Sequence, residues 1–383
     1  MHQELVKFVR EIYSSNEVIP LHAPIFAGNE SKYVTETIDS TFVSSVGKFV
    51  DEFESQIENY TKCKKAVATV NGTSALHTAL YMSDVQRGDM VITQALTFVA
   101  TCNVLYHMGV EPVFVDVSME SMGLCPMKTG KWLDENAFID SAGECRHKFT
   151  NRKISAILPM HTFGHPVQLD GFLDLCSEWN LKLIEDAAES LGSFYRGQHT
   201  GTFGKFSALS FNGNKVITTG GGGMVLCQSD LEGARTKHIT TTAKVSHPFE
   251  FFHDEPGFNY RLPNINAALG CAQLENIGTL LDKKRQIANN YMSFFNRSDY
   301  VFFKEPEYAK SNYWLNCVIC PTKKSRDQLL LETNRAGVMT RPIWKLMSNL
   351  PAFKHCLSDD LSNSKYLEEH AVNIPSGISK ELM

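Results

Sequence analysis

Short apolar runs alternate with helix-like stretches between about residue 65 and residue 245. Each run has the length of a strand, and the stretch that follows it is long enough for a helix to cross back over a sheet. This alternation predicts an α/β fold with a mostly parallel sheet and helices on both faces. Seven strands are expected, at 65–70, 90–93, 112–116, 154–158, 181–185, 206–211 and 223–227.

The rest of the chain predicts a smaller second domain. At 383 residues the chain exceeds the usual size of one domain. Residues 264–295 carry apolar side chains at helical spacing, which predicts one long helix linking two domains. Strand-like runs at 313–319 and 337–342 flank another helix and indicate a small α+β domain. We therefore expect a large domain at 1–260 and a linking helix with the small domain at 261–383.

Residues 118–153 have the least regular composition within the large domain. We interpret this segment as an insertion that forms a surface loop. A contact with substrate or with a second subunit is the alternative role.

Lys215 stands where the apolar run 206–211 gives way to small and polar residues. Ser210 precedes it by five positions, and the glycine turn 220–223 follows. This layout suits pyridoxal phosphate, because a lysine amine can bond to the cofactor aldehyde and a serine hydroxyl can reach its phosphate. The glycines let the backbone pass close to the ring. The alternative for this segment alone is a surface lysine in a loop.

Asp186 ends the buried run 181–185 and is followed by small residues. Ligands of parallel sheets bind at the carboxyl ends of the strands. A carboxylate there can keep the pyridine nitrogen of the cofactor protonated, so that the ring withdraws electrons. The alternative is an aspartate that caps the next helix.

Phosphate ligands are expected after the strand 65–70, where Gly72, Thr73 and Ser74 open a helix. Free N–H groups and the helix dipole attract a phosphate at such an end, although an ordinary helix cap is the alternative. Phe98 follows the next strand, where an aromatic ring could stack on the cofactor or belong to the core.

Together these segments resemble the DegT-type nucleotide-sugar aminotransferases, a branch of the fold-type I pyridoxal phosphate enzymes. The likeness runs along nearly the whole chain. The motifs that carry it are Phe42–Val50, Asn71–Ser74, Pro159–Pro166, Glu185–Ser190, Phe206–Lys215 with Thr218–Gly223, and Gly257–Ala268.

The resemblance implies a role for each matching residue. Lys215 matches the lysine that bonds to the cofactor, and Asp186 matches the partner of the ring nitrogen. Glu189 matches the residue that faces the ring hydroxyl. Asn259 matches a residue that reaches the phosphate in the neighbouring subunit, which implies a homodimer with shared active sites. The matching phosphate ligands are Thr73, Ser74 and Ser210.

The resemblance also implies transamination of a sugar. Relatives take the amino group from glutamate in most cases and pass it to a nucleotide-linked keto sugar. Members that carry a histidine in place of the lysine are dehydratases, so Lys215 favours transamination. The alternative is a non-catalytic regulatory protein that only binds the ligand, although such a protein would need neither Lys215 nor Asp186.

Substrate contacts are expected from Ser44, His161 and Arg341. For His161 a structural role is the alternative, and for Arg341 a surface ion pair. The motifs are most similar to those of the legionaminic-acid pathway aminotransferase. That similarity implies amination at C4 of a nucleotide-linked 2-acetamido-2,6-dideoxy-4-hexulose.

Composition agrees with a cytoplasmic enzyme. A net charge of −5 argues against nucleic acid or an anionic membrane as partner. The N-terminus carries charges where a signal peptide is apolar, and no apolar run approaches the ~20 residues that span a bilayer. The ten cysteines lack the paired spacing of a zinc site, so no metal is expected and buried thiols are the better interpretation.

Overall fold

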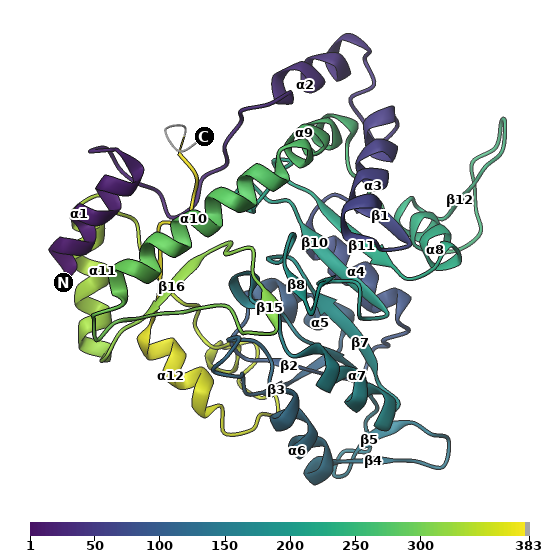
Figure 1. Ribbon diagram of the computed structural model, residues 1–383. Coiled ribbons are helices and arrows are strands. Elements are labelled where there is room, and N and C mark those ends of the chain that lie inside the picture. Colours follow the sequence, from purple (N-terminus) through teal and green to yellow (C-terminus); the bar gives the residue numbers. More distant parts are fainter. Residues whose placement is uncertain (380–383) are drawn as a thin grey trace.

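A seven-stranded sheet forms the centre of the computed structural model, which describes residues 1–379 (Figure 1). Its strand order is β1-β11-β10-β7-β6-β2-β3, and only β11 runs antiparallel to the others. The seven predicted strands are therefore confirmed. Their bounds are β1 Lys65–Thr69, β2 Met90–Gln94, β3 Glu111–Val115, β6 Ile154–Leu158, β7 Lys182–Asp186, β10 Phe206–Ser210 and β11 Gly223–Cys227.

Helices cover both faces of this sheet because successive strand residues point to opposite sides. In β1, Val67 packs into a core shared with α4 (Gly72–Met82) and α5 (Val99–Met108). Its neighbours Ala66 and Ala68 pack instead with α3 (Lys48–Thr61) and α9 (Asn264–Glu275). At the other edge of the sheet, β2, β3 and β6 pack on this second face against α6 (Pro126–Asn136) and α7 (Leu169–Glu178).

Strand register brings the ends of three strands to one edge of the sheet. Asp186 at the end of β7 pairs with Ala208, two residues before the end of β10. Ser210 at the end of β10 pairs with Gly223, which also pairs with Thr69 at the end of β1. The segments that follow these strands therefore leave the sheet side by side.

The segment 118–153 is not a surface loop, so that expectation is wrong. It contains α6 and a hairpin of β4 (Ala137–Ile139) with β5 (Cys145–His147). Trp132, Leu133 and Cys145 are buried among side chains of the central sheet. Arg146 of the hairpin is only partly buried and pairs with Asp140 at 2.5 Å.

The expectation of one helix at 264–295 is also wrong. The structure has two helices there, α9 and α10 (Ile277–Phe295). The break falls at Asn276, whose φ of −103° and ψ of 5° lie outside the helical range. Asparagine and the nearby Gly278 both have low helix propensity, which explains the break.

A second sheet lies in the C-terminal part of the chain, in the order β14-β16-β18-β17. Its strands are β14 Val301–Phe302, β16 Asn316–Ile319, β17 Arg341–Pro342 and β18 Ala371–Ile374. One face packs against α10, α11 (Lys323–Arg335) and the N-terminal helix α1 (His2–Tyr13). The other face packs against side chains of the large part, including Phe114 and Phe163. The division at residue 260 stays a prediction.

Smaller elements complete the chain. A long hairpin of β12 (Lys244–Val245) and β13 (Phe252–His253) projects beside α8 (Asp230–Thr240) in Figure 1. Within residues 1–379, no helix combines the length and the apolar character needed to cross a bilayer. The remaining elements are α2 Glu30–Asp39, α12 Ser362–His370, β8 Phe194–Tyr195, β9 Gln198–His199, β15 Ala309–Lys310, and the 3-10 turns at Thr162–Gly164 and Met347–Asn349.

Candidate active site

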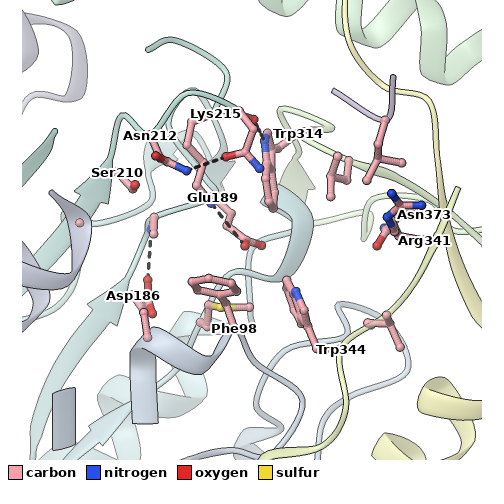
Figure 2. Close-up of a pocket in the computed structure, with 18 of the residues that line it drawn as sticks. Phe98, Asp186, Glu189, Ser210, Asn212, Lys215, Trp314, Arg341, Trp344 and Asn373 are labelled. Carbon is pink, nitrogen blue, oxygen red and sulfur yellow. Dashed lines mark hydrogen bonds and ion pairs between the residues drawn. The ribbon is translucent and has the colours of Figure 1, made fainter. Parts of the chain in front are cut away.

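A cavity of about 730 Å³ opens at the carboxyl edge of the central sheet. Figure 2 shows Asp186, Ser210 and Lys215 around one end of it and Arg341 with Asn373 at the other. Asp186 and Ser210 end strands of the central sheet and Lys215 follows one, whereas Arg341 and Asn373 belong to the C-terminal sheet. Residues far apart in the sequence therefore line one space.

Lys215 enters this cavity from the loop after β10. A backbone hydrogen bond from its N–H to the carbonyl of Asn212 closes the turn that carries it. Its Nζ lies 3.5 Å from Oε1 of Glu189 and 3.8 Å from the centre of the Trp314 ring. The side chain is only 13 % exposed. It is therefore not a surface lysine.

Glu189 is buried beside this lysine, and the N–H of Phe163 donates to its Oε2 at 2.9 Å. Burial raises the pKa of Glu189 to about 7, and the charge of Lys215 opposes that rise. Burial thus favours the neutral form of this carboxyl group, which can donate as well as accept a hydrogen bond toward the cavity.

Asp186 lies at the end of β7, on the floor of the cavity. Its Oδ2 accepts a hydrogen bond from the hydroxyl of Thr101 at 2.8 Å, and its Oδ1 accepts from the N–H of Ala188 at 3.2 Å. Burial raises its pKa, while the Thr101 hydrogen bond, the Ala188 amide and the nearby Lys215 charge oppose the change. An anion held in this way is suited to a cationic partner such as a protonated ring nitrogen.

The N-terminus of α4 supplies donors for an anion. Asn71 caps the helix by accepting the N–H of Ser74 at 2.7 Å, so an ordinary cap is present. Gly72 and Thr73 lie in the first turn of the helix, where backbone N–H groups have no carbonyl partner within the helix. Both residues line the cavity. A Cβ on Gly72 would lie 2.7 Å from the Cβ of Ser210. Glycine is therefore needed for the close approach of these two segments.

Aromatic rings form one wall. Phe98 lines the cavity and is 48 % exposed, which excludes the alternative of a core phenylalanine. Its ring centre lies 6.3 Å from that of Trp344. Trp344 in turn packs against the buried Phe163 at 5.0 Å. A flat cofactor or sugar ring would find apolar surface on this side.

Arg341 lies at the opposite end (Figure 2), and Lys345 and Arg326 also line the cavity. Its guanidinium donates to Oδ1 of Asn334 at 3.1 Å and to the carbonyl of Thr340 at 3.0 Å. Both acceptors are neutral, so the expected alternative of a surface ion pair is not what this structure shows. The positive charge stays available to an anionic ligand.

Four of the expected site residues lie outside this cavity, namely Ser74, Ser44, Asn259 and His161. Ser74 is buried within α4, one residue beyond Thr73. Ser44 is exposed, and its carbonyl accepts the N–H of Asn264 at 2.6 Å. Asn259 is exposed and accepts a hydrogen bond from Arg261 at 3.0 Å.

His161 also stays outside, and the expectation that it touches substrate is not supported. It is fully buried below the cavity, with Nε2 3.1 Å from Oε2 of Glu185. Its Nδ1 accepts the N–H of Val167 at 3.2 Å, so Nε2 carries the proton given to Glu185. Burial alone would raise the pKa of Glu185, but the hydrogen bond from His161 and the amides of Gly204 and Gly201 lower it. His161 is thus a structural histidine with both ring nitrogens engaged.

Several lining residues were not expected from the sequence. Trp314 belongs to the C-terminal part, yet its Nε1 donates to the carbonyl of Asn214 at 2.6 Å beside Lys215. Asn71 and Asn212 also line the cavity. Their only signal in the sequence is proximity to Gly72 and Lys215, and Trp314 has no such neighbour.

The residues at the sheet end of the cavity fit pyridoxal phosphate. Lys215 would bond to its aldehyde and Asp186 would face its ring nitrogen. The free amides of Gly72 and Thr73, with Ser210 beside them, would hold its phosphate. The cradle between Gly72 and Ser210 has no room for a larger side chain. Fold and site together define a pyridoxal-phosphate-dependent enzyme.

Comparison with known proteins identifies the family. The model of the DegT/DnrJ/EryC1/StrS aminotransferase family matches residues 24–381, so the chain belongs to this family and is a pyridoxal-phosphate-dependent sugar aminotransferase. It is 34 % identical over 363 residues to the GDP-perosamine synthase of Escherichia coli O157:H7, covering 94 % of this chain and 93 % of that protein. It is 33 % identical over 365 residues to EpsN of Bacillus subtilis, a putative pyridoxal phosphate-dependent aminotransferase, covering 94 % and 91 % of the two chains.

Solved structures support the same fold. Helicobacter pylori PseC, an aminotransferase involved in the biosynthesis of pseudoaminic acid, superposes with a TM-score of 0.84 at 22 % identity, covering 94 % of both chains. The expected α/β architecture with a mostly parallel sheet is thereby confirmed.

Proposed function

We propose that this enzyme moves an amino group from L-glutamate to C4 of a nucleotide-linked 4-keto-6-deoxy sugar. The observation that carries the proposal is the two-ended cavity. Lys215 and Asp186 lie at one end and Arg341 lies at the other (Figure 2), and Arg326 and Lys345 also belong to the lining. A sugar nucleotide has its reactive carbonyl and its charged diphosphate at separate ends, so it matches this layout.

The size and charge of the cavity support such a substrate. Its volume of about 730 Å³ lies within the usual range of small-molecule sites. Guanidinium groups bind phosphate oxygens with two parallel hydrogen bonds, which gives direction as well as attraction. Arg341 is the residue we assign to the diphosphate, or to the carboxylate of glutamate in the other half of the reaction.

We assign each residue at the sheet end of the cavity a role in this transamination. The bound cofactor supplies an electron-withdrawing ring. Lys215 holds the proton that moves at the reacting carbon, a role typically worth about 10²–10⁴ in rate. Asp186 keeps the ring nitrogen protonated, and Glu189 bonds to the ring hydroxyl. No observation favours the alternative of a non-catalytic binding protein, because Lys215 and Asp186 face the same cavity.

For the sugar we propose the 2-acetamido-2,6-dideoxy-4-hexulose of legionaminic-acid or related cell-surface glycan synthesis. The motifs around Ser44, His161 and the glycine turn 220–223 support this choice. A GDP-linked keto sugar is the second candidate, favoured by the likeness to the GDP-perosamine synthase.

One experiment separates these candidates. The holoenzyme with glutamate is incubated with UDP- and GDP-linked 4-keto-6-deoxy sugars, each with and without the 2-acetamido group. Mass spectrometry and NMR of the products identify the aminated carbon. We expect amination at C4 of the 2-acetamido sugar, and product only from the GDP sugar without that group would overturn the choice. Absence of amination on every sugar would overturn the proposed function.

We further propose a homodimer with shared active sites. Asn259 and Ser44 are exposed and outside the cavity of their own subunit, which supports a contact with the partner's site. The projecting hairpin beside α8 carries three exposed phenylalanines, Phe249, Phe251 and Phe252, at 89 %, 84 % and 57 % exposure (Figure 1). Such an apolar group favours burial against another chain.

A further inference from the structure

The amine of Lys215 lies between an aromatic face and a carboxylate. Its Nζ is 3.8 Å from the centre of the Trp314 ring and 3.5 Å from Oε1 of Glu189 (Figure 2). Trp314 is 4 % exposed and Glu189 is 3 % exposed. A cation attracted to an aromatic face gains most where water is excluded, as it is here.

Hydrogen bonds hold the indole in place without help from the lysine. Its Nε1 donates to the carbonyl of Asn214 at 2.6 Å, and its backbone N–H donates to Oδ1 of Asn312 at 2.7 Å. Its carbonyl accepts from Nζ of the buried Lys284 at 3.2 Å. The ring is therefore fixed on the loop that carries Lys215.

The side chain of Asn312 links the backbone of Trp314 to the backbone of Glu189. Nδ2 of Asn312 donates to the carbonyl of Glu189 at 2.8 Å while its Oδ1 accepts from Trp314. Asn312 is itself tightly enclosed, because a Cβ on Gly164 would lie 1.8 Å from its Oδ1. The two backbones are thus held side by side, and with the indole bonded to Asn214 and the carboxylate to the N–H of Phe163 they form a preformed cradle for an ammonium group.

We propose that Trp314 is a positioning residue that holds the charged amine of Lys215 beside Glu189 whenever this amine is not bonded to the cofactor. The proposal rests on the role given to Lys215 under the proposed function. In each catalytic cycle the amine leaves the cofactor and must return to it. A fixed resting place keeps the amine near the reacting carbon and out of the substrate's path.

The proposal has a measurable consequence for the first half of the reaction. Glutamate and water are consumed, 2-oxoglutarate is released, the cofactor gains the amino group, and the Lys215 amine becomes free. Trp314 stabilises only the free amine. A weaker attraction therefore shifts the equilibrium toward the form in which the lysine is bonded to the cofactor.

Fluorinated tryptophans test this directly, because fluorine weakens the negative face of the ring while its shape changes little. Residue 314 is replaced by tryptophans with one, two and three ring fluorines. The ratio of the two cofactor forms is read from the absorption spectrum at fixed glutamate and 2-oxoglutarate. We expect a stepwise shift toward the lysine-bonded form, reaching about 3- to 30-fold for Trp314→Leu. Trp314→Phe should lie between Leu and wild type.

Trp132 provides the matched control. It is also buried, at 6 % exposure, and stacks on His147 away from the cavity. Fluorination there should leave the ratio unchanged. Equal ratios across the series at residue 314 would overturn the proposal and give Trp314 a packing role alone.

Borohydride reduction and peptide mass spectrometry of the same samples test the role of Trp314 separately from the assignment of Lys215. Cofactor trapped on Lys215 with no effect of fluorine refutes only the role of Trp314. Cofactor trapped on another lysine refutes the assignment of Lys215 itself.

Discussion

Oε1 of Glu189 lies 3.5 Å from Nζ of Lys215, and both side chains are shielded from water. The pair joins residues from two different strand ends, the loop after β7 and the loop after β10. Burial keeps the pKa of Glu189 raised to about 7 in spite of the nearby cation. The charge balance of the site is therefore sensitive to pH near neutrality.

Glu189→Gln should change how stability depends on pH. The pKa of Glu189 is about 7 in the folded state and 4.5 without burial. The folded state therefore binds the extra proton, and wild type loses stability as pH rises from about 4.5 to 7. The variant should lack this loss, so its free energy of unfolding, relative to that of wild type, should rise by roughly 1 kcal/mol per pH unit over this range.

Urea unfolding of the cofactor-free protein between pH 5 and 8 measures this difference. Glu250→Gln, at an exposed glutamate, is the control and should follow wild type. Parallel curves for wild type and Glu189→Gln would contradict the raised pKa.

Lys215→Ala should give a colourless protein without aminotransferase activity, because no amine remains to bond to the cofactor. Absorption spectra after dialysis against pyridoxal phosphate, together with borohydride trapping, measure the bond. Lys324→Ala, at an exposed lysine of α11, should stay yellow and active. A yellow, active Lys215→Ala enzyme would show that another residue bonds to the cofactor.

Asp186→Asn should slow turnover by about 10² or more while cofactor still binds, since it removes a directed charge from a dry site. Thr101→Val removes only the 2.8 Å hydrogen bond to Oδ2 and should cost about 10-fold, in line with a charge-assisted bond. Thr101→Ser keeps the hydroxyl and should stay close to wild type. Single-turnover kinetics with glutamate make the measurement, and wild-type rates in Asp186→Asn would contradict the assignment.

Lys284→Met should remove a second contribution to the pH dependence of the free energy of unfolding. This lysine is 1 % exposed, and its Nζ bonds to His22, to the carbonyl of Trp314 and to that of Ser376. Burial lowers its pKa from 10.5 to about 7, so the unfolded state binds more protons between these values. The free energy of unfolding of wild type, relative to that of the variant, should therefore rise by roughly 1 kcal/mol per pH unit from 7 to 10.

Urea unfolding at pH 6.5, 8 and 9.5 makes this measurement. Lys283→Met, at the neighbouring position of α10, is the matched control. A constant difference between wild type and Lys284→Met across this range would mean that the lysine titrates as it does in water.

Mixed dimers test whether active sites are shared. Asn259→Ala should weaken cofactor binding by about 1.5–3 kcal/mol if its amide bonds to the partner's phosphate. Mixing this variant with Lys215→Ala gives dimers in which one site has both an intact lysine and the partner's intact asparagine. Activity should therefore rise above that of either variant alone. Proven subunit exchange without this rise, with a weakened Asn259→Ala parent, would place Asn259 in its own subunit's site.

The strand pattern was predictable because it depends on local sequence. Buried strands are short apolar runs, and seven such runs match β1, β2, β3, β6, β7, β10 and β11. The ends of parallel strands lie on one edge, so Asp186, Ser210 and Lys215 could be grouped before any contact was known. The family resemblance added their roles.

Local composition was misleading where packing decides the outcome. Residues 118–153 suggested a loop, yet Trp132 and Cys145 bury one side of that segment against the sheet. His161 follows a strand on the carboxyl side, as a catalytic histidine could, but its side chain turns to Glu185 below the cavity. Neither orientation is encoded in spacing along the chain.

The sequence by itself determined the large sheet and the position of Lys215 and Asp186 at or after strand ends, because these follow from the pattern of apolar runs. Only the tertiary structure brought Trp314 onto Lys215 and Arg341 to the far end of the cavity. About one hundred residues separate Trp314 from Lys215, and the packing of the C-terminal sheet against the large part joins them. Contacts of this kind depend on the summed packing of many side chains and leave no local pattern to detect.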